Sequence, residues 1–119
     1  MSPKSGTDLI NEAKARIREV TAVESKTRLA AGGAVFLDCR ESSEYNLGRI
    51  PGAVLIPRGQ LETKVEQLIA RDARVVVYCA TGNRSALAAD TMQQMGYANV
   101  ASMKGGWRDW LMTDGPVDE

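Results

Sequence analysis

The chain of 119 residues contains no histidine. Hydrolases of the Ser-His-Asp or Cys-His type are therefore excluded, because they need an imidazole as their general base. The chain has only two cysteines, Cys39 and Cys79, so we do not expect a structural zinc site and predict no metal. Any cysteine chemistry in this chain must therefore activate the thiol without an imidazole.

An excess of one charge and long apolar runs are also lacking. Lys and Arg total 15, as do Asp and Glu, so we expect neither nucleic acid nor a membrane surface as a partner. No apolar stretch is long enough to cross a membrane, and residues 1–8 lack the apolar core of a signal peptide. We therefore expect a cytoplasmic protein, although a chain already stripped of a signal peptide would have the same features. Two cysteines suggest free thiols, although one disulfide could form.

Short β-branched runs alternate with segments of helical period along the chain. This alternation predicts an α/β fold in one domain, with a parallel sheet covered by helices on both faces. We expect strands at 20–23, 35–38, 53–56, 74–78 and 100–103, and helices at 24–31, 61–69 and 85–95, with a short helix ending at 47. The predicted organisation is an N-terminal helical extension (1–19), the main domain (20–112) and a flexible tail (113–119).

The segment Cys79–Ser85 follows an apolar run, Val75–Tyr78, and precedes an Ala-rich helical segment. In parallel sheets, ligands bind at the carboxyl ends of the strands, which is where this cysteine is expected. Gly82 permits a positive φ, Arg84 adds a positive charge, and the following helix adds its positive end, so together they favour a thiolate. The alternative is that Cys79 is a small core residue. The candidate site comprises Cys79, Ala80, Thr81, Gly82, Asn83, Arg84 and Ser85.

This segment resembles the active-site loop of single-domain rhodanese-like sulfurtransferases, which commonly reads Cys-x-x-Gly-x-Arg-Ser. The resemblance covers about residues 20–112, because further segments match motifs of that family in the same order. These segments are Leu37–Glu41, Glu44–Tyr45, Gly48–Ala53, Ile56–Pro57 and Gly105–Trp107. Each motif is weak alone, but their order makes the resemblance specific.

The resemblance implies a three-layer domain around a five-stranded parallel sheet, and a double-displacement reaction. A donor such as thiosulfate or a persulfide would pass its outer sulfur to Cys79. An acceptor such as cyanide, a thiol or a protein cysteine would then remove it. The covalent persulfide is the intermediate, so no cofactor is expected. Asp38 and Arg40 match the Asp-x-Arg that supports the loop in this family; alternatively, they are solvated charges at a strand end.

Two other functions fit parts of the sequence. Phosphatases and arsenate reductases of this fold use Cys-x5-Arg, which would put the arginine at position 85, where this chain has Ser85. Arg84 comes one residue early, so the loop is expected to hold sulfur rather than phosphate. Non-catalytic rhodanese-like modules bind or regulate other proteins and often lose the cysteine, whereas Cys79 is present here.

Among the departures from the pattern of the family, three concern the candidate site. The two-domain thiosulfate enzymes carry basic residues where this chain has Glu44 and Thr81. Both charges would contact a sulfonate oxygen, so we expect thiosulfate to be a weak donor and a persulfide to be the better one. Cys39 stands where an apolar residue is common. We interpret it as a packing residue, with a disulfide to Cys79 as the alternative.

Overall fold

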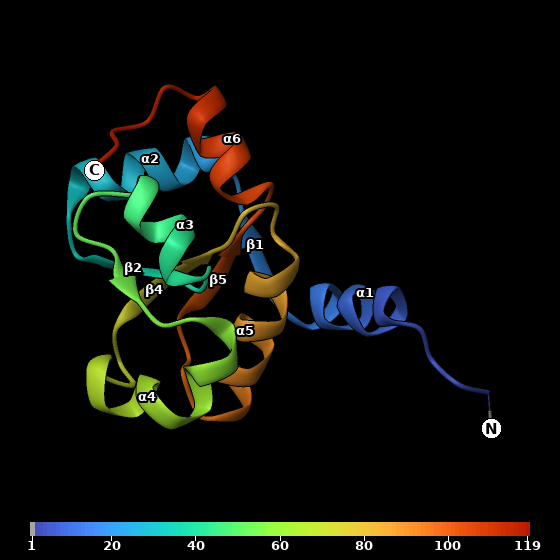
Figure 1. Cartoon of the computed structure of the whole chain (residues 1–119). Coiled ribbons are helices and arrows are strands. Elements are labelled where there is room, and N and C mark those ends of the chain that lie inside the picture. The colour runs from blue at the N-terminus through green and yellow to red at the C-terminus, as the bar shows by residue number, and fades with distance from the viewer. Residues whose placement is uncertain (1) are drawn as a thin grey trace.

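The computed structural model describes residues 2–119 and has an α/β fold (Figure 1). In chain order, the elements are α1 (Gly6–Arg16), β1 (Arg18–Val20), α2 (Ala22–Ala31), β2 (Ala34–Asp38), α3 (Ser42–Leu47), β3 (Val54–Leu55), the 3-10 helix η1 (Arg58–Gln60), α4 (Leu61–Leu68), β4 (Arg74–Tyr78), α5 (Asn83–Gln94), β5 (Val100–Met103) and α6 (Gly106–Met112). No helix among residues 2–119 is both long and apolar enough to span a membrane.

The five strands form one parallel sheet in the order β1-β5-β4-β2-β3. Strand β4 lies at its centre, and successive side chains of this strand point to opposite faces. Val75 and Val77 pack in a hydrophobic cluster with residues of α4 and α5. Val76 and Tyr78 pack in a second hydrophobic cluster, which includes Trp110 of α6. Figure 1 shows α4 and α5 on one side of the sheet, with α2, α3 and α6 on the other. The predicted three-layer architecture is therefore confirmed.

Strand β4 has the predicted bounds, but several other elements start earlier than expected. Strand β1 ends at Val20, because Thr21 caps α2 and exchanges hydrogen bonds with Glu24 in a capping box. Helix α5 begins at Asn83 rather than at residue 85, since Gly82 takes a φ of 101° and serves as its N-cap. Asn83, Arg84 and Ser85 therefore lie in the first helical turn rather than in an open loop.

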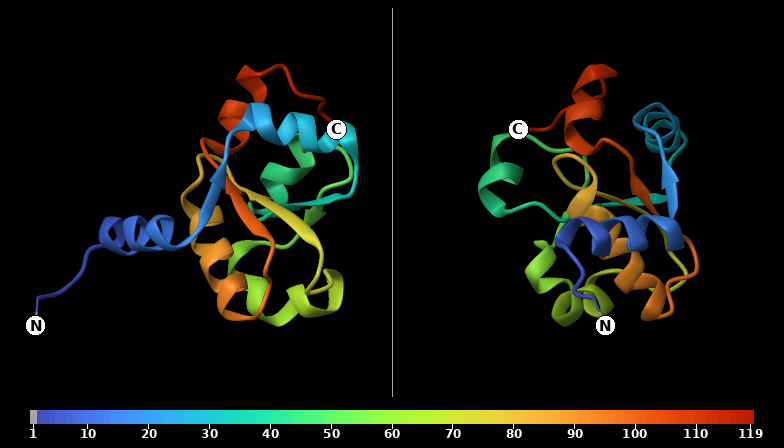
Figure 2. Two further views of the ribbon diagram at one scale, coloured as in Figure 1. Left: turned by 180° about the vertical axis from the view of Figure 1, so that it is seen from behind. Right: turned by 90° about the vertical axis from the view of Figure 1, so that its right-hand side faces the viewer.

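Helix α1 packs against α5 and extends from the side of the domain, with the N-terminus directed away from it (Figure 2). Arg16 donates to both carboxylate oxygens of Asp90 on α5, at 3.0 and 2.8 Å. The side chain of Gln93 donates to the carbonyl of Arg16 at 3.1 Å. The N-terminal helix is thus attached to the same helix whose first turn follows Cys79.

The C-terminal segment 113–119, predicted to be a flexible tail, lies against the domain. The indole N–H of Trp110 donates to the carbonyl of Pro116 at 2.9 Å. Arg49 and Asp118 exchange two backbone hydrogen bonds of 3.0 and 2.9 Å in an isolated antiparallel bridge. These contacts join the end of the chain to the loop that follows α3.

Helix α6 starts directly against the segment that follows β4. The N–H groups of Trp107 and Arg108 donate to the carbonyls of Cys79 and Ala80, at 2.8 and 3.2 Å. Gly106 has a φ of 54°, and a Cβ on it would lie 2.3 Å from the carbonyl oxygen of Cys79. Glycine is therefore required here both for its backbone conformation and for the close approach.

We expect Gly106→Ala to lower the free energy of unfolding by about 2–4 kcal/mol, because it combines an unfavourable φ with a steric overlap. Urea denaturation measures this change. Gly59→Ala is the matched control, since a Cβ at Gly59 would meet no atom within 4 Å. Its effect should stay within about 0.5 kcal/mol. Equal effects for both variants would contradict the role assigned to Gly106.

Candidate active site

The candidate site lies at the carboxyl edge of the sheet, where β2 and β4 end side by side. Asp38 is paired with Tyr78 in the parallel register, so Cys39 and Cys79 are the next residues of the two strands. The N–H of Cys39 donates to the carbonyl of Tyr78 at 3.0 Å. The two cysteines, 40 residues apart in the sequence, are therefore neighbours at this edge, and both are free thiols.

The sulfur of Cys79 is surrounded by neutral hydrogen-bond donors. The N–H groups of Gly82 and Ser85 donate to it at 3.1 and 3.4 Å, and the hydroxyl of Ser85 lies 3.5 Å away. Ser102 on β5 fixes that hydroxyl through a contact of 2.8 Å between the two side-chain oxygens. Cys79 is only 1% exposed, so these donors are shielded from competing water.

These contacts stabilise the thiolate of Cys79 and lower its pKa to about 4. The largest cause is a hydrogen bond from the thiol of Cys39, followed by those from Ser85 and Gly82, while burial opposes the shift. The pKa of Cys39 is raised well above its usual value by the same hydrogen bond and by burial. One cysteine is therefore an anion and the other a protonated donor.

Arg84 was expected to supply positive charge to this loop, but its guanidinium is paired with Glu44 on α3. Two hydrogen bonds of 3.0 and 3.2 Å join Arg84 to the carboxylate. The ion pair lowers the pKa of Glu44 and raises that of Arg84. The acidity of Cys79 therefore rests mainly on neutral hydrogen bonds, and Arg84 is not among the main contributors to it.

Asp38 and Arg40 form a buried ion pair with an oxygen–nitrogen distance of 2.7 Å. Arg40 also donates to the carbonyl of Gly48 at 2.7 Å, and its guanidinium lies 4.7 Å from the ring of Trp107. The backbone of Trp107 in turn donates to the carbonyl of Cys79. The pair therefore reaches the candidate site through Trp107, and the alternative of solvated strand-end charges is wrong, because Asp38 is 0% and Arg40 3% exposed.

The remaining loop residues lie further from the sulfur. Ala80 accepts a hydrogen bond from α6, while Thr81 and Asn83 are exposed. Thr81 borders a polar hollow of about 420 Å³ beside the loop. The hollow is lined by Lys14, Glu19, Thr81, Gly82, Lys104, Gly105, Arg108 and Asp109. It offers a charged approach to the loop that comes in part from helix α1.

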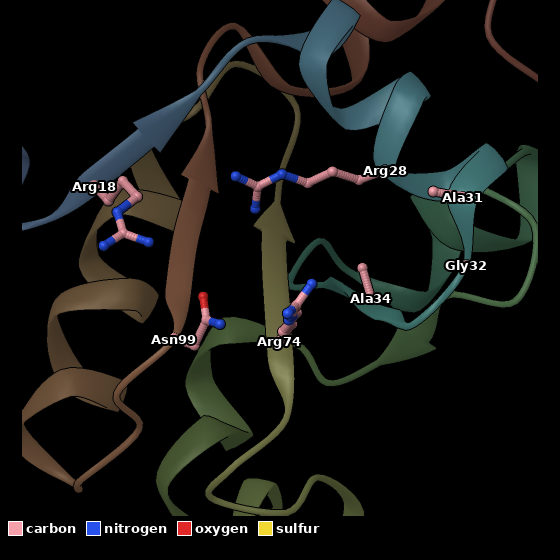
Figure 3. Close-up of a pocket in the computed structure, with 7 residues that line it drawn as sticks. All are labelled: Arg18, Arg28, Ala31, Gly32, Ala34, Arg74 and Asn99. Carbon is pink, nitrogen blue, oxygen red and sulfur yellow. The ribbon is translucent and has the colours of Figure 1, made fainter.

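A second hollow, of about 310 Å³, lies near the amino-terminal ends of the strands (Figure 3). Arg18, Arg28 and Arg74 extend toward it from β1, α2 and β4. Because Arg18 and Arg74 are the first residues of their strands, this hollow is separated from Cys79 by the length of the sheet. It is not part of the candidate active site.

Two contacts of the site, those of Ser102 and Trp107, were not predicted from the sequence. Ser102 carried no signal, because its strand reads as a short apolar segment. Trp107 was given no role of its own, although Gly105-Gly106-Trp107 is one of the motifs that match the family. The proximity of Cys39 to Cys79, which the disulfide alternative required, is explained by the register of β2 and β4. Among residues 2–119, no group of three or more Cys, Asp or Glu side chains lies close enough to hold a metal ion.

Comparison with known proteins places the chain in a family. The model of the rhodanese-like domain matches residues 21–113. A putative sulfur carrier protein of Bacillus subtilis is 32% identical over 108 residues, which cover 90% of this chain. This chain spans only 58% of the length of that relative. Human thiosulfate:glutathione sulfurtransferase is 30% identical over 77% of this chain and 91% of its own length.

Among solved structures, a protein of unknown function from Rhodopseudomonas palustris, described as a possible tyrosine phosphatase, matches with a TM-score of 0.88. It is 31% identical, and the match covers 99% of this chain and 97% of that one. The family match covers strands β2 to β5 and the segment that holds Cys79. The chain therefore belongs to the rhodanese-like domain family, alongside sulfurtransferases.

Proposed function

We propose that this chain is a sulfurtransferase that carries sulfane sulfur on Cys79. The donor is thiosulfate or a persulfide, and the acceptor is a nucleophile such as cyanide, a small thiol or a protein cysteine. The observation that carries this proposal is the buried sulfur of Cys79, which accepts hydrogen bonds from the N–H groups of Gly82 and Ser85 and has a lowered pKa. The reaction uses no cofactor, since the cysteine itself is the carrier.

Both half-reactions balance without proton transfer. With thiosulfate, the Cys79 thiolate attacks the outer sulfur, the sulfur–sulfur bond of the donor breaks, and sulfite leaves with its two charges. A persulfide anion remains on the enzyme. The acceptor then attacks the terminal sulfur and restores the thiolate, so that cyanide becomes thiocyanate. Because the nucleophile is already ionised, the reaction needs no general base, which suits a chain without histidine.

We propose that a persulfide is the better donor. The carboxylate of Glu44 occupies the guanidinium of Arg84, and Thr81 is neutral. No unpaired cation on the loop is therefore directed at a sulfonate. A specificity constant for thiosulfate as high as that for glutathione persulfide would contradict this proposal.

A phosphatase is the second candidate function, because one similar solved structure is described as a possible tyrosine phosphatase. A phosphate ester presents a tetrahedral dianion and needs an arginine directed into the loop. In this chain Arg84 comes one residue early and is paired with Glu44. A purely binding role leaves the acidity of Cys79 without a purpose. The two free thiols suit a reducing compartment, and we propose a cytoplasmic location.

Incubation with thiosulfate or glutathione persulfide is expected to raise the mass of the protein by one sulfur atom. Cys79→Ala should show no added mass, because no other thiolate is available. Intact-mass spectrometry measures the mass of the wild type and of the variant. Phosphate-ester hydrolysis by the wild type should remain at the level of Cys79→Ala. Hydrolysis that depends on Cys79, with no added sulfur from either donor, would instead establish a phosphatase.

The thiolate of Cys79 is expected to titrate with a pKa of about 4, so its ultraviolet absorbance should be complete above about pH 6. In Cys39→Ala the midpoint should move to higher pH, because the largest stabilising hydrogen bond is gone. Cys79→Ala supplies the baseline, since Cys39 should remain protonated across this range. An unchanged midpoint in Cys39→Ala would show that Cys39 does not stabilise the thiolate.

Glu44→Gln is expected to raise kcat/KM for thiosulfate about two- to fivefold, because it frees the guanidinium of Arg84 for the sulfonate. This range matches the free energy of about 0.2–1 kcal/mol typical of exposed ion pairs. Glu62→Gln is the matched control, since it removes the same charge from an ion pair with Arg58 on η1. Equal gains in both variants would indicate a general effect of net charge rather than release of Arg84.

A further inference from the structure

Cys39 lies beside the candidate nucleophile, yet the proposed double displacement does not use it as a reactant. It is fully buried, it directly follows β2, and the parallel register places it beside Cys79. A packing residue at this position needs only an apolar side chain. A second thiol in contact with a sulfur carrier can also react with it.

The geometry of the sheet permits a bond between the two sulfurs. Neighbouring parallel strands lie about 4.8 Å apart. A disulfide requires a Cα–Cα distance of about 4.4–6.8 Å. Cys39 and Cys79 directly follow the paired residues Asp38 and Tyr78, and the backbone of Cys39 is hydrogen-bonded to Tyr78. Residues at adjacent positions of this kind can be joined with little movement of the backbone.

The backbone N–H groups and the thiol of Cys39 lie near the sulfur of Cys79 but belong to different elements. The N–H groups of Gly82 and Ser85 reach it from the segment that leads into α5. Cys39 reaches it from β2. A terminal sulfur held by the N–H groups would leave the inner sulfur in contact with Cys39.

We propose that Cys39 is an internal acceptor thiol, which attacks the inner sulfur of the Cys79 persulfide, releases hydrosulfide and forms a Cys39–Cys79 disulfide. This inference rests on the proposed function, because it starts from the persulfide. It adds an activity: the chain converts sulfane sulfur into sulfide when no external acceptor is at hand.

The step balances in atoms, charge and electrons. The proton of Cys39 moves to the anionic terminal sulfur of the persulfide, which makes it a better leaving group and makes Cys39 a thiolate. The Cys39 sulfur then bonds to the inner sulfur, the sulfur–sulfur bond of the persulfide breaks, and hydrosulfide leaves with the electron pair. The sulfane sulfur is reduced and the two cysteines are oxidised. No outside oxidant takes part, and an external thiol or dithiol reduces the disulfide to restore the enzyme.

The test follows a single turnover under anaerobic conditions. The protein is loaded with glutathione persulfide, freed of donor by rapid desalting, and followed by intact mass and by a sulfide electrode. In the wild type, the mass gain of one sulfur atom should give way to a loss of two hydrogen atoms. One sulfide should appear per loaded chain, and non-reduced peptide mapping should link Cys39 to Cys79.

Cys39→Ser and Cys39→Ala should load with sulfur but retain it, with loss of the sulfide release seen in the wild type. Because Cys39 also stabilises the thiolate, release is normalised to the fraction of chains loaded. Should neither variant fold, the linked peptides of the wild type decide the question alone.

The outcomes separate this inference from the proposed function. Sulfur loading without linked peptides, and with equal release from wild type and variants, would overturn the inference and leave the sulfurtransferase intact. No loading of any protein with either donor would overturn the proposed function itself. A linked pair that forms in donor-free, anaerobic controls at the same rate would also count against the persulfide route.

Discussion

The parallel pairing of β2 with β4 is the constraint on which the candidate site depends. Because Asp38 lies opposite Tyr78, the next residues of the two strands are both cysteines, and Cys39 helps to lower the pKa of Cys79. A shift of one residue would turn the Cys39 side chain toward the other face of the sheet. The chemistry of Cys79 is therefore set by backbone pairing 40 residues away in the sequence as much as by its own loop.

Neutral hydrogen-bond donors stabilise the thiolate without the desolvation cost that a buried cation would add. A cation beside Cys79 would have to be buried with it, at a large cost in desolvation. The N–H groups of Gly82 and Ser85 and the thiol of Cys39 carry no net charge, and they are held by the fold before any substrate arrives. A persulfide has the same single charge as the thiolate it replaces. The site can therefore hold either species without a change of protonation elsewhere.

Local sequence patterns predicted most of the strands and helices. They did not predict the contacts between segments that are distant in the sequence. The bounds of β4 and the position of Cys79 follow from a β-branched run and a following Gly-containing turn, which are local signals. The pairing of Arg84 with Glu44 depends on where α3 lies above the sheet, and composition does not encode it. The partnership of Cys39 with Cys79 required the strand register. A resemblance to the family located the site, but residues in which this chain departs from that pattern determine its electrostatics.

Helix α1 completes the surroundings of the loop rather than simply preceding the domain. Its last turn is tied to α5 by the bidentate pair of Arg16 and Asp90. Two residues earlier, Lys14 reaches the hollow beside Thr81, which Lys104 and Arg108 also line. The sulfur of Cys79 is almost fully buried, so an acceptor must approach through the surface around the loop. Glu19 and Asp109 also line that hollow, and Asp109 is paired with Arg108, so its surface carries charges of both signs, whereas Arg84 beside the sulfur is neutralised by Glu44. The charged side chains thus lie on the approach to the loop, while the groups that contact the sulfur of Cys79 are neutral, so binding of a charged substrate and stabilisation of the thiolate depend on different residues.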